Sequence, residues 1–319
     1  MILARLASLR LTLATLALLA GGVAVFAAVD SASPLWVSAP LLALAVNLCA
    51  AIATRPAFRR NGPLLAFHLA LLAVVALAAV GRLTYLKGQL ELAEGEVFAG
   101  QLTTERAGPL HGGSLQSVRF VNDGFTIRYA PGLKRAETRN PVRVFDQDGR
   151  VRTLVIGDNE PLILDGYRFY TSANKGFSLV FLWYPRAGVP ERGTVNLPSY
   201  PMNEHRQALD WKLPAGGPAV WTMLHFEKAP LDERAETWFR TPDSHHVVLR
   251  MQDARWELRP GQQVRFEAGD LVYEGVTTWM GYQVFYDWTI PWMLAACLTA
   301  VLALGWHFAR QFSRQPWNA

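Results

Sequence analysis

Cysteine is nearly absent from this chain of 319 residues, which contains only Cys49 and Cys297. Both lie in apolar runs that we expect to cross a membrane, in opposite leaflets, where they are too far apart for a disulfide. The polar segment between the third and fourth runs has no cysteine, which excludes a Cys-x-x-Cys thiol oxidoreductase and a Cys-x-x-Cys-His cytochrome. The sequence also lacks a Gly-x-Ser-x-Gly motif, a phosphate-binding loop and a zinc-ligand spacing.

Apolar residues make up 51% of the chain, but they are concentrated in four runs. Each run reaches or approaches the roughly 17–25 residues that a helix needs to cross a bilayer. The runs are Leu11–Val29, Leu35–Ala53, Pro63–Val80 and Ile290–Ala309. Residues 1–81 are therefore expected to form three membrane-spanning helices and residues 82–289 a soluble domain. Residues 290–319 then hold a fourth span and a short tail.

The short loops predict the orientation. The loop between the first two spans, residues 30–34, has no basic residue. The segments at the other ends of the spans carry Arg5, Arg10, Arg55, Arg59, Arg60, Arg310 and Arg314. Because Lys and Arg in short loops mark the cytoplasmic side, we expect both termini in the cytoplasm. The large domain is then periplasmic, on a multi-pass protein of the inner cell membrane. The lipid bilayer is the expected surrounding, and the net charge of +5 needs no nucleic-acid partner.

The N-terminus allows a second interpretation. Residues 1–30 have a basic start, an apolar middle and a Val-Phe-Ala-Ala-Val ending, which is typical of a cleavable signal peptide. The apolar run is long, however, and further spans follow almost at once, so an uncleaved first span is favoured.

The soluble domain is predicted to be antiparallel and all-β. The pair Asp123-Gly124 between residues 117–122 and 125–130, and residues 147–150 between 141–146 and 151–157, predict two hairpins. Further strands are expected at 166–173, 177–185, 219–228, 246–253, 254–260, 271–277 and 281–287. Many short strands without a helical period favour a sandwich or an open barrel. The expected fold is an integral membrane protein with four transmembrane α-helices and this β-domain between the third and the fourth.

Histidines of the soluble domain give weak metal candidates. His245 and His246 are adjacent, and adjacent residues of a strand point to opposite faces, so a surface position is favoured over a shared metal site. His111, His205 and His225 are scattered without ligand spacing.

His68 is the strongest candidate for a functional residue. It lies in the third apolar run, about 8 Å beyond Pro63 at 1.5 Å per residue. An ionisable side chain at membrane depth is costly and usually faces a cavity, another helix or a ligand. Imidazole is a common metal and haem ligand, and the surrounding leucines suit a porphyrin. The competing interpretation, equally strong from the residues alone, is a structural imidazole that hydrogen-bonds a neighbour such as Asn47. In a haem site, Asn47 would instead support the histidine ligand from behind.

Three arginines and a second histidine lie near the same side of the predicted spans. Arg55, Arg59 and Arg60 would mark topology in any membrane protein, and guanidinium groups also suit the propionates of haem. His307 is only three residues from Arg310, so its imidazole can reach the interface, and this structural interpretation is favoured over haem binding. Trp36, Trp288, Trp292 and Trp306 are expected to be interfacial anchors.

The order of three spans, a β-rich domain and a fourth span resembles the ResB (CcsB) family of System II cytochrome c biogenesis proteins. Local matches are Phe67-His68 leading to Gly81, followed by the Leu-Glu-Leu-Ala-Glu-Gly-Glu stretch of residues 90–96. Residues 159–172 resemble the family's Asn-x-Pro-Leu…Gly-x-x-x-Tyr segment, and residues 281–287 lead into the fourth span. Residues 287–289 read Asp-Trp-Thr where the family often has Asp-Pro-Gly. The chain is short for the family, which indicates a trimmed soluble domain.

The resemblance implies a complex with a CcsA/ResC-type membrane subunit that has a tryptophan-rich haem-handling segment. Together the two carry haem b, held transiently and shared, across the membrane and support its attachment to apocytochrome c. His68 matches the family's third-span histidine, which implies that it is an axial ligand and that the only metal is haem iron. The chain lacks the tryptophan-rich segment, so alone it is a half-site or non-catalytic subunit of a haem-lyase complex.

A different class of function remains open. The chain could be a membrane-anchored extracytoplasmic protein-binding module with no haem role, in which the spans only tether the β-domain. Such a tether has no use for His68 and Asn47 inside its spans, whereas a haem site does. A solute transporter is disfavoured because four spans without inverted repeats make a poor alternating-access device.

Overall fold

The structure is a computed structural model that describes residues 2–145, 149–202, 207–214 and 217–313. The chain divides into two compact units. The helical unit contains residues 1–87, 106–113 and 285–319, and the β-unit contains residues 88–105 and 114–284. The segment 106–113, which the sequence places in the soluble domain, thus belongs to the helical unit.

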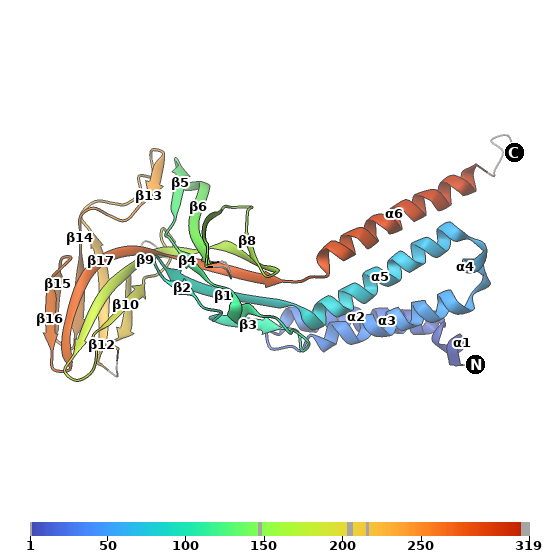
Figure 1. Ribbon diagram of the computed structural model, residues 1–319, viewed down its shortest axis with the longest axis horizontal. Helices are drawn as coiled ribbons and strands as arrows, with labels where there is room; N and C mark the ends of the chain where they lie inside the picture. The colour runs from blue at the N-terminus through green and yellow to red at the C-terminus, as the bar shows by residue number, and fades with distance from the viewer. Residues whose placement is uncertain (1, 146–148, 203–206, 215–216, 314–319) are drawn as a thin grey trace. The chain divides into compact units, whose positions relative to one another are not determined.

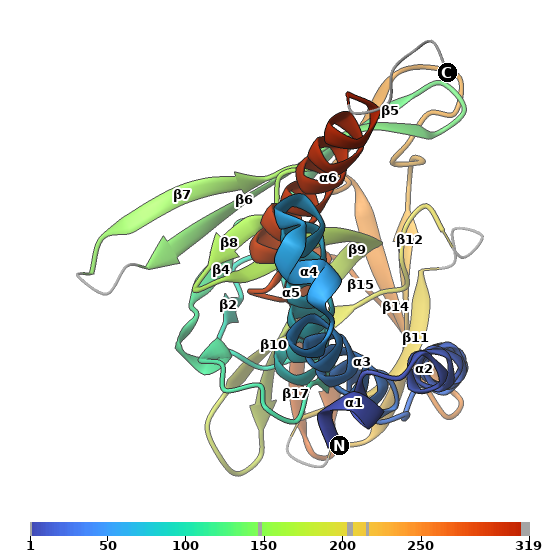
Figure 2. The same ribbon diagram turned by 90° about the vertical axis from the view of Figure 1, so that its right-hand side faces the viewer.

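Among the described residues, four helices are long and apolar enough to cross a membrane: α2 (Leu9–Ala28), α3 (Leu35–Thr54), α5 (Gly62–Thr84) and α6 (Ile290–Phe312). Two five-residue helices, α1 (Ile2–Leu6) and α4 (Pro56–Arg60), precede α2 and join α3 to α5. Helix α2 packs on α3, α3 on α5 and α5 on α6, so the long helices form a row in that order (Figure 2). The expected multi-pass membrane protein with four spans is confirmed.

We call the end of the row where the chain passes into the β-unit, at Thr84 of α5 and Ile290 of α6, the connecting end. The opposite end holds α1, α4 and the C-terminus of α6.

Helices α2 and α3 approach each other closely at Gly22. Pro40, inside α3, has no N–H, so the Trp36 carbonyl one turn earlier lacks its helical donor. Gly22 lies against that carbonyl, and a Cβ at position 22 would overlap it. A residue without a side chain is therefore required there, as at many close helix contacts in membranes.

The β-unit contains three antiparallel sheets. Seven strands form the first: β1 (Leu86–Ala93), β3 (Thr104–Ala107), β8 (Leu162–Leu164), β9 (Tyr167–Pro185), β10 (Glu191–Asn196), β16 (Gln263–Phe266) and β17 (Gly269–Tyr286). Its order is β10-β9-β17-β1-β3, with β16 beside β17 and β8 beside β9, and β9 and β17 are its long strands (Figure 1). Strands β1, β3 and β17 continue into the helical unit.

The other two sheets are smaller. Six strands form the second, in which β6 is central: β2 (Val97–Phe98), β4 (Phe120–Asn122), β5 (Thr126–Ala130), β6 (Lys134–Phe145), β7 (Val151–Ile156) and β13 (Thr237–Phe239). Four form the third, in the order given: β11 (Ala208–Lys212), β12 (Ala219–Phe226), β14 (His245–Met251) and β15 (Ala254–Leu258). A 3-10 turn, η1 (Leu115–Ser117), is also present. The expected antiparallel all-β domain between the third and fourth spans is confirmed.

Aromatic side chains join the sheets. Phe120 of β4 packs against Phe169 of β9 and Tyr282 of β17, with ring centroids 5.1 and 5.8 Å apart. Phe177 of β9 stacks on Phe239 of β13 at 4.7 Å. All five side chains are buried, and burial of a large apolar side chain contributes roughly 1.5–3 kcal/mol. The core of the β-unit therefore lies between its sheets.

One of the two predicted hairpins is wrong. Strands β4 and β5 flank Asp123-Gly124, but β4 pairs with the second half of β6 and β5 with the first half, not with each other. A two-residue type I′ turn needs positive φ at both central residues, and of this pair only Gly124 has it, at 82°. The second hairpin is confirmed by the pairing of β6 with β7; residues 147 and 148 of its turn lie outside the described residues.

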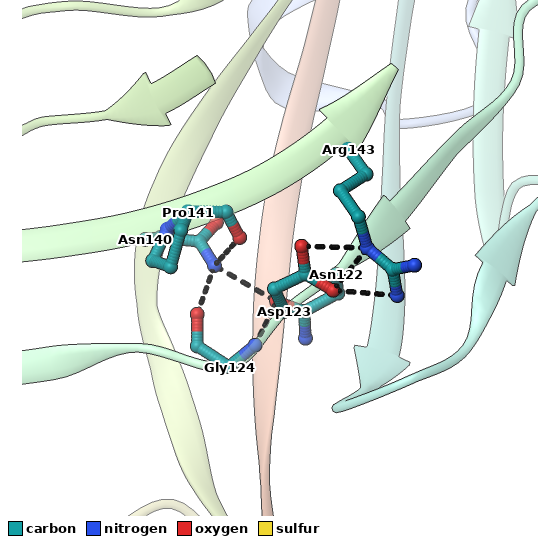
Figure 3. Close-up of polar contacts among 6 residues, drawn as sticks. All are labelled: Asn122, Asp123, Gly124, Asn140, Pro141 and Arg143. Atoms are coloured by element: carbon teal, nitrogen blue, oxygen red, sulfur yellow. Dashed lines mark hydrogen bonds and ion pairs between the residues drawn. The ribbon is translucent and has the colours of Figure 1, made fainter. Parts of the chain in front are cut away.

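A buried polar network lies at the Asp123-Gly124 junction between β4 and β5 (Figure 3). The side-chain amide of Asn140 donates to Asn122 Oδ1 at 2.8 Å and to the Gly124 carbonyl. Asn122 Oδ1 also accepts from the Gly124 amide at 3.1 Å, and Tyr282 donates its hydroxyl to Asn140 Oδ1 at 2.8 Å. Asn122 and Asn140 are completely buried, and burial raises the pKa of Tyr282. At the surface, Asp123 and Arg143 form a bidentate ion pair.

Candidate functional site

His68 lies on α5, two turns from the start of the helix. Its Nδ1 is 2.8 Å from the carbonyl oxygen of Leu64, one turn earlier. A carbonyl can only accept, so Nδ1 must carry a proton, and in the neutral imidazole this leaves the lone pair on Nε2. Among the residues that the structure describes, Nε2 has no hydrogen-bond partner. This is the tautomer of most metal-bound histidines, whose other nitrogen donates to a carbonyl or a carboxylate.

Two phenylalanine rings flank the imidazole. The ring of Phe58, on α4, lies 4.5 Å from that of His68, and the ring of Phe67 lies 5.1 Å from it in an edge-on arrangement. His68 is half-buried, while Leu69 and Leu71 beside it are 48% and 38% exposed. The surroundings of Nε2 are therefore apolar and aromatic. Phe58 had no signal in the sequence, because only the fold of α4 back onto α5 brings it there.

The three predicted arginines lie on or next to α4. Arg55 donates to the carbonyl of Ala7 at 3.5 Å, and Arg59 donates to that of Ala53 at 3.1 Å. All three, Arg60 included, are exposed, and none pairs with a carboxylate among the described residues. Since Phe58 precedes Arg59 by one residue, α4 brings cationic side chains and the imidazole into one neighbourhood. That combination suits a ligand with a metal centre and acidic groups.

Asn47 lies elsewhere. Its side-chain amide donates to the carbonyls of Leu6 and Ser8, and its Oδ1 accepts from Thr12 Oγ1 at 2.7 Å. Asn47 therefore fastens the α1–α2 connection to α3. The amide has no hydrogen bond to His68, whose own partner is Leu64, so the interpretation that pairs these two side chains finds no contact here.

His307 bonds a different residue at the same end of the row. Its Nδ1 lies 3.2 Å from the side-chain nitrogen of Asn61, which must be the donor, so His307 accepts. Asn61 Oδ1 in turn accepts from the Leu64 amide and caps α5. His307 thus links α6 to the start of α5, and among the described residues it has no hydrogen bond to His68. No local sequence pattern pairs residues 61 and 307.

The β-unit has a second candidate surface. An open groove of about 660 Å³ lies beside the Asn122–Asn140 network. Its lining combines two acidic and two arginine side chains with two phenylalanines: Glu94, Asp123, Arg139, Arg240, Phe125 and Phe239. Among the described residues no group of three His, Cys, Asp or Glu side chains is placed to hold a metal ion.

Residues 45–199 match the model of the ResB-like family. The match covers just under half of the chain, and the resemblance is confirmed over this region. The ResB-like region contains His68, Asn47 and all three arginines of the candidate site, whereas His307 lies beyond it. The match supports a role in cytochrome c biogenesis. No curated protein matches the chain.

The ResB-like region also shows what its sequence motifs do. Glu94 accepts from Thr277 and Thr278 of β17, and Glu96 accepts from Thr194 of β10. Gly95 between them has φ of 85°, so the chain can turn sharply where β1 ends. The Glu-Gly-Glu motif therefore ties three strands of one sheet together, which is a structural role.

Proposed function

We propose that this ResB-like protein is a subunit of a System II complex that carries haem across the membrane with a CcsA/ResC-type partner. The complex then supports attachment of haem to apocytochrome c. The observation that carries the proposal is the His68 imidazole, whose Nδ1 donates to Leu64, whose Nε2 has no hydrogen-bond partner among the described residues and whose ring packs against Phe58 and Phe67. Nε2 is the proposed axial ligand of haem b, and Arg55, Arg59 and Arg60 are the proposed partners of its propionates.

The proposed topology follows from charge. The basic residues of α4 and of the C-terminal end of α6 lie at the opposite end from the connecting end. By the positive-inside rule that end is cytoplasmic, which places the β-unit in the periplasm and His68 in the cytoplasmic half of the inner membrane. Haem supplies the iron and the vinyl groups that react with the thiols of apocytochrome c, and this chain supplies a ligand on the side where haem enters.

Replacing His68 by alanine is expected to abolish axially ligated haem. The full chain, alone and with its partner, is purified, given haem b and followed by reduced absorption spectra. Loss of the ligand should weaken binding by roughly 100-fold or more, since even groups that merely orient a ligand are worth 10- to 100-fold. Added imidazole should restore the bands.

The matched control is His307→Ala, which removes an imidazole from the same end of the row and should retain haem. If wild-type protein with its partner binds no haem, or His68→Ala binds it unchanged, His68 is structural. The membrane-anchored protein-binding module, with its groove in the β-unit, is then the better account.

The arginines are tested with a ligand whose charge can be removed. Wild-type protein should bind haem b about tenfold or more tightly than haem dimethyl ester, because a hydrogen bond between charged groups contributes about 1.5–3 kcal/mol. The double variant Arg59→Gln/Arg60→Gln should bind both alike. Arg5→Gln/Arg10→Gln, which removes the same charge nearby, should keep the preference. Equal binding of the two ligands by wild type would show that these arginines do not contact propionates.

A further inference from the structure

Residues 108–112 form a loop, here called the capping loop, that covers the C-terminus of α5. The last carbonyls of a helix have no donors within the helix and must find them elsewhere. The amide of Leu110 donates to Leu83 at 2.8 Å, and His111 Nδ1 donates to Thr84 at 2.8 Å. The amide of Gly108 donates to Tyr85 at 2.9 Å. The capping loop thus supplies three donors in succession.

The capping loop is fixed at a defined depth. A Cβ at position 108 would overlap the backbone of Leu83, so the loop can lie this close only because residue 108 is glycine. Helix α5 has 23 residues and is therefore about 34 Å long, close to the thickness of the hydrocarbon core. From this length we expect its end at Thr84, and the capping loop bonded to it, at the boundary between hydrocarbon and headgroups.

The side chains around the capping loop are those of a membrane interface. Leu110 is 65% exposed although its backbone is bonded to α5. Trp288 donates its indole N–H to Thr84 Oγ1 at 3.1 Å and leaves 44% of its side chain exposed. Tryptophan is enriched at this level of membrane proteins because one part of the ring is polar and the rest apolar.

Two arginines lie at the same end and have no carboxylate partner among the described residues. The guanidinium of Arg106 lies 3.8 Å from the ring centroid of Phe26, and that of Arg82 lies 5.7 Å from the same centroid. Arg106 donates to the Ala32 carbonyl at 3.1 Å, which uses one of its five N–H groups. The remaining donors suit phosphate, which guanidinium binds in a bidentate manner.

We propose that Leu110 inserts into the leaflet at the connecting end and that Arg82 and Arg106 bind the phosphate of an anionic phospholipid there. The occupant is a lipid, because the apolar side chain and the two cations lie at the depth where acyl chains meet headgroups. The proposal does not depend on the haem role of His68.

Insertion of Leu110 is tested by a fluorescent label. Leu110→Cys is made in a Cys49→Ala/Cys297→Ala background, labelled with an environment-sensitive dye and placed in phosphatidylcholine–phosphatidylglycerol vesicles. We expect quenching by lipids spin-labelled near the headgroup and protection from aqueous iodide. The control is Val189→Cys, 78% exposed in the β-unit, which should show the reverse. Quenching of label 110 by iodide, or protection from both quenchers, overturns the proposal, since water or a protein then covers the loop.

Phosphate binding is tested by native mass spectrometry of the full chain released from the same vesicles. Arg82→Gln/Arg106→Gln should retain at least about fivefold less phosphatidylglycerol than wild type, an estimate from the roughly 1 kcal/mol that a basic residue near anionic lipid contributes. Arg192→Gln/Arg265→Gln, which removes two exposed arginines of the β-unit, should retain the wild-type amount. Equal retention by all three proteins overturns the phosphate assignment.

Discussion

Replacing Asn140 by leucine is expected to destabilise the β-unit by about 4 kcal/mol. Leucine has a similar branched shape but cannot form hydrogen bonds, so it leaves the Gly124 carbonyl and the Tyr282 hydroxyl buried without their partner. Each orphaned group costs about 1–3 kcal/mol. For a unit of this size the unfolding temperature should fall by about 10 °C. Near-ultraviolet circular dichroism of the full chain in detergent measures it, because the aromatic residues concentrate in the β-unit.

Two further variants distinguish the contribution of the buried network to stability from that of the surface ion pair beside it. Tyr282→Phe orphans only Asn140 Oδ1 and should cost about 1–2 kcal/mol. Arg143→Gln breaks the ion pair with Asp123 at the surface and should cost less than about 1 kcal/mol. An Asn140→Leu protein that unfolds at the wild-type temperature would show that the network contributes nothing to stability.

Lys175 should make the β-unit more stable as the pH rises. Its side chain is 4% exposed, and its ammonium donates to the Ser172 carbonyl at 3.3 Å. Burial, and to a lesser extent the nearby Arg135, lowers the pKa of Lys175 from 10.5 to about 8, although Asp158 opposes the shift. Below pH 8 the amine is protonated in both states, and the folded state bears the full cost of the buried charge.

Above pH 8 the folded protein releases this proton while the unfolded chain keeps it up to about pH 10.5, so the free energy of unfolding increases. We expect a gain of about 2 kcal/mol between pH 7 and 9.5. Lys175→Met should be more stable than wild type at pH 7 and should lose the slope. Denaturant titrations stay below pH 10, because burial raises the pKa of Tyr200 to about 12 and its unfolded-state ionisation opposes folding above 10. The exposed Lys212→Met is the control; a wild-type profile flat in this range would contradict the assignment.

The contrast between two Asp-Gly pairs shows what local sequence can and cannot predict. Asp165 and Gly166 both have positive φ, 50° and 83°, and join β8 to β9 in a tight hairpin. Asp123-Gly124 has the same letters but joins two strands that both pair with β6. At the second pair, the side-chain amide of Asn140 on β6 donates to Asn122 Oδ1 and to the Gly124 carbonyl, so contacts with another strand accompany the different pairing. Strand pairing of this kind depends on contacts that no local pattern contains.

In the helices and the candidate site, too, some features could be predicted from local sequence and others could not. Hydropathy placed all four spans, since a run of about 20 apolar residues has few alternatives. It also singled out His68, because one imidazole in such a run is conspicuous. The short helix α4, which brings Phe58 to His68, carries no such pattern, and the bond between Asn61 and His307 joins residues 246 positions apart. The candidate residue could be predicted from the sequence, but its neighbours in the fold could not.

The row of helices has a consequence for anything bound at His68. A layer one helix thick has two faces and no interior, so a large flat ligand on it is enclosed on one side only. The other side must be closed by a neighbouring molecule or by lipid. When one neighbour contacts both the layer and the ligand, ligand binding strengthens assembly by the same factor by which assembly strengthens ligand binding. The gain in ligand affinity caused by the neighbour and the gain in neighbour affinity caused by the ligand are then two measurements of the same coupling free energy.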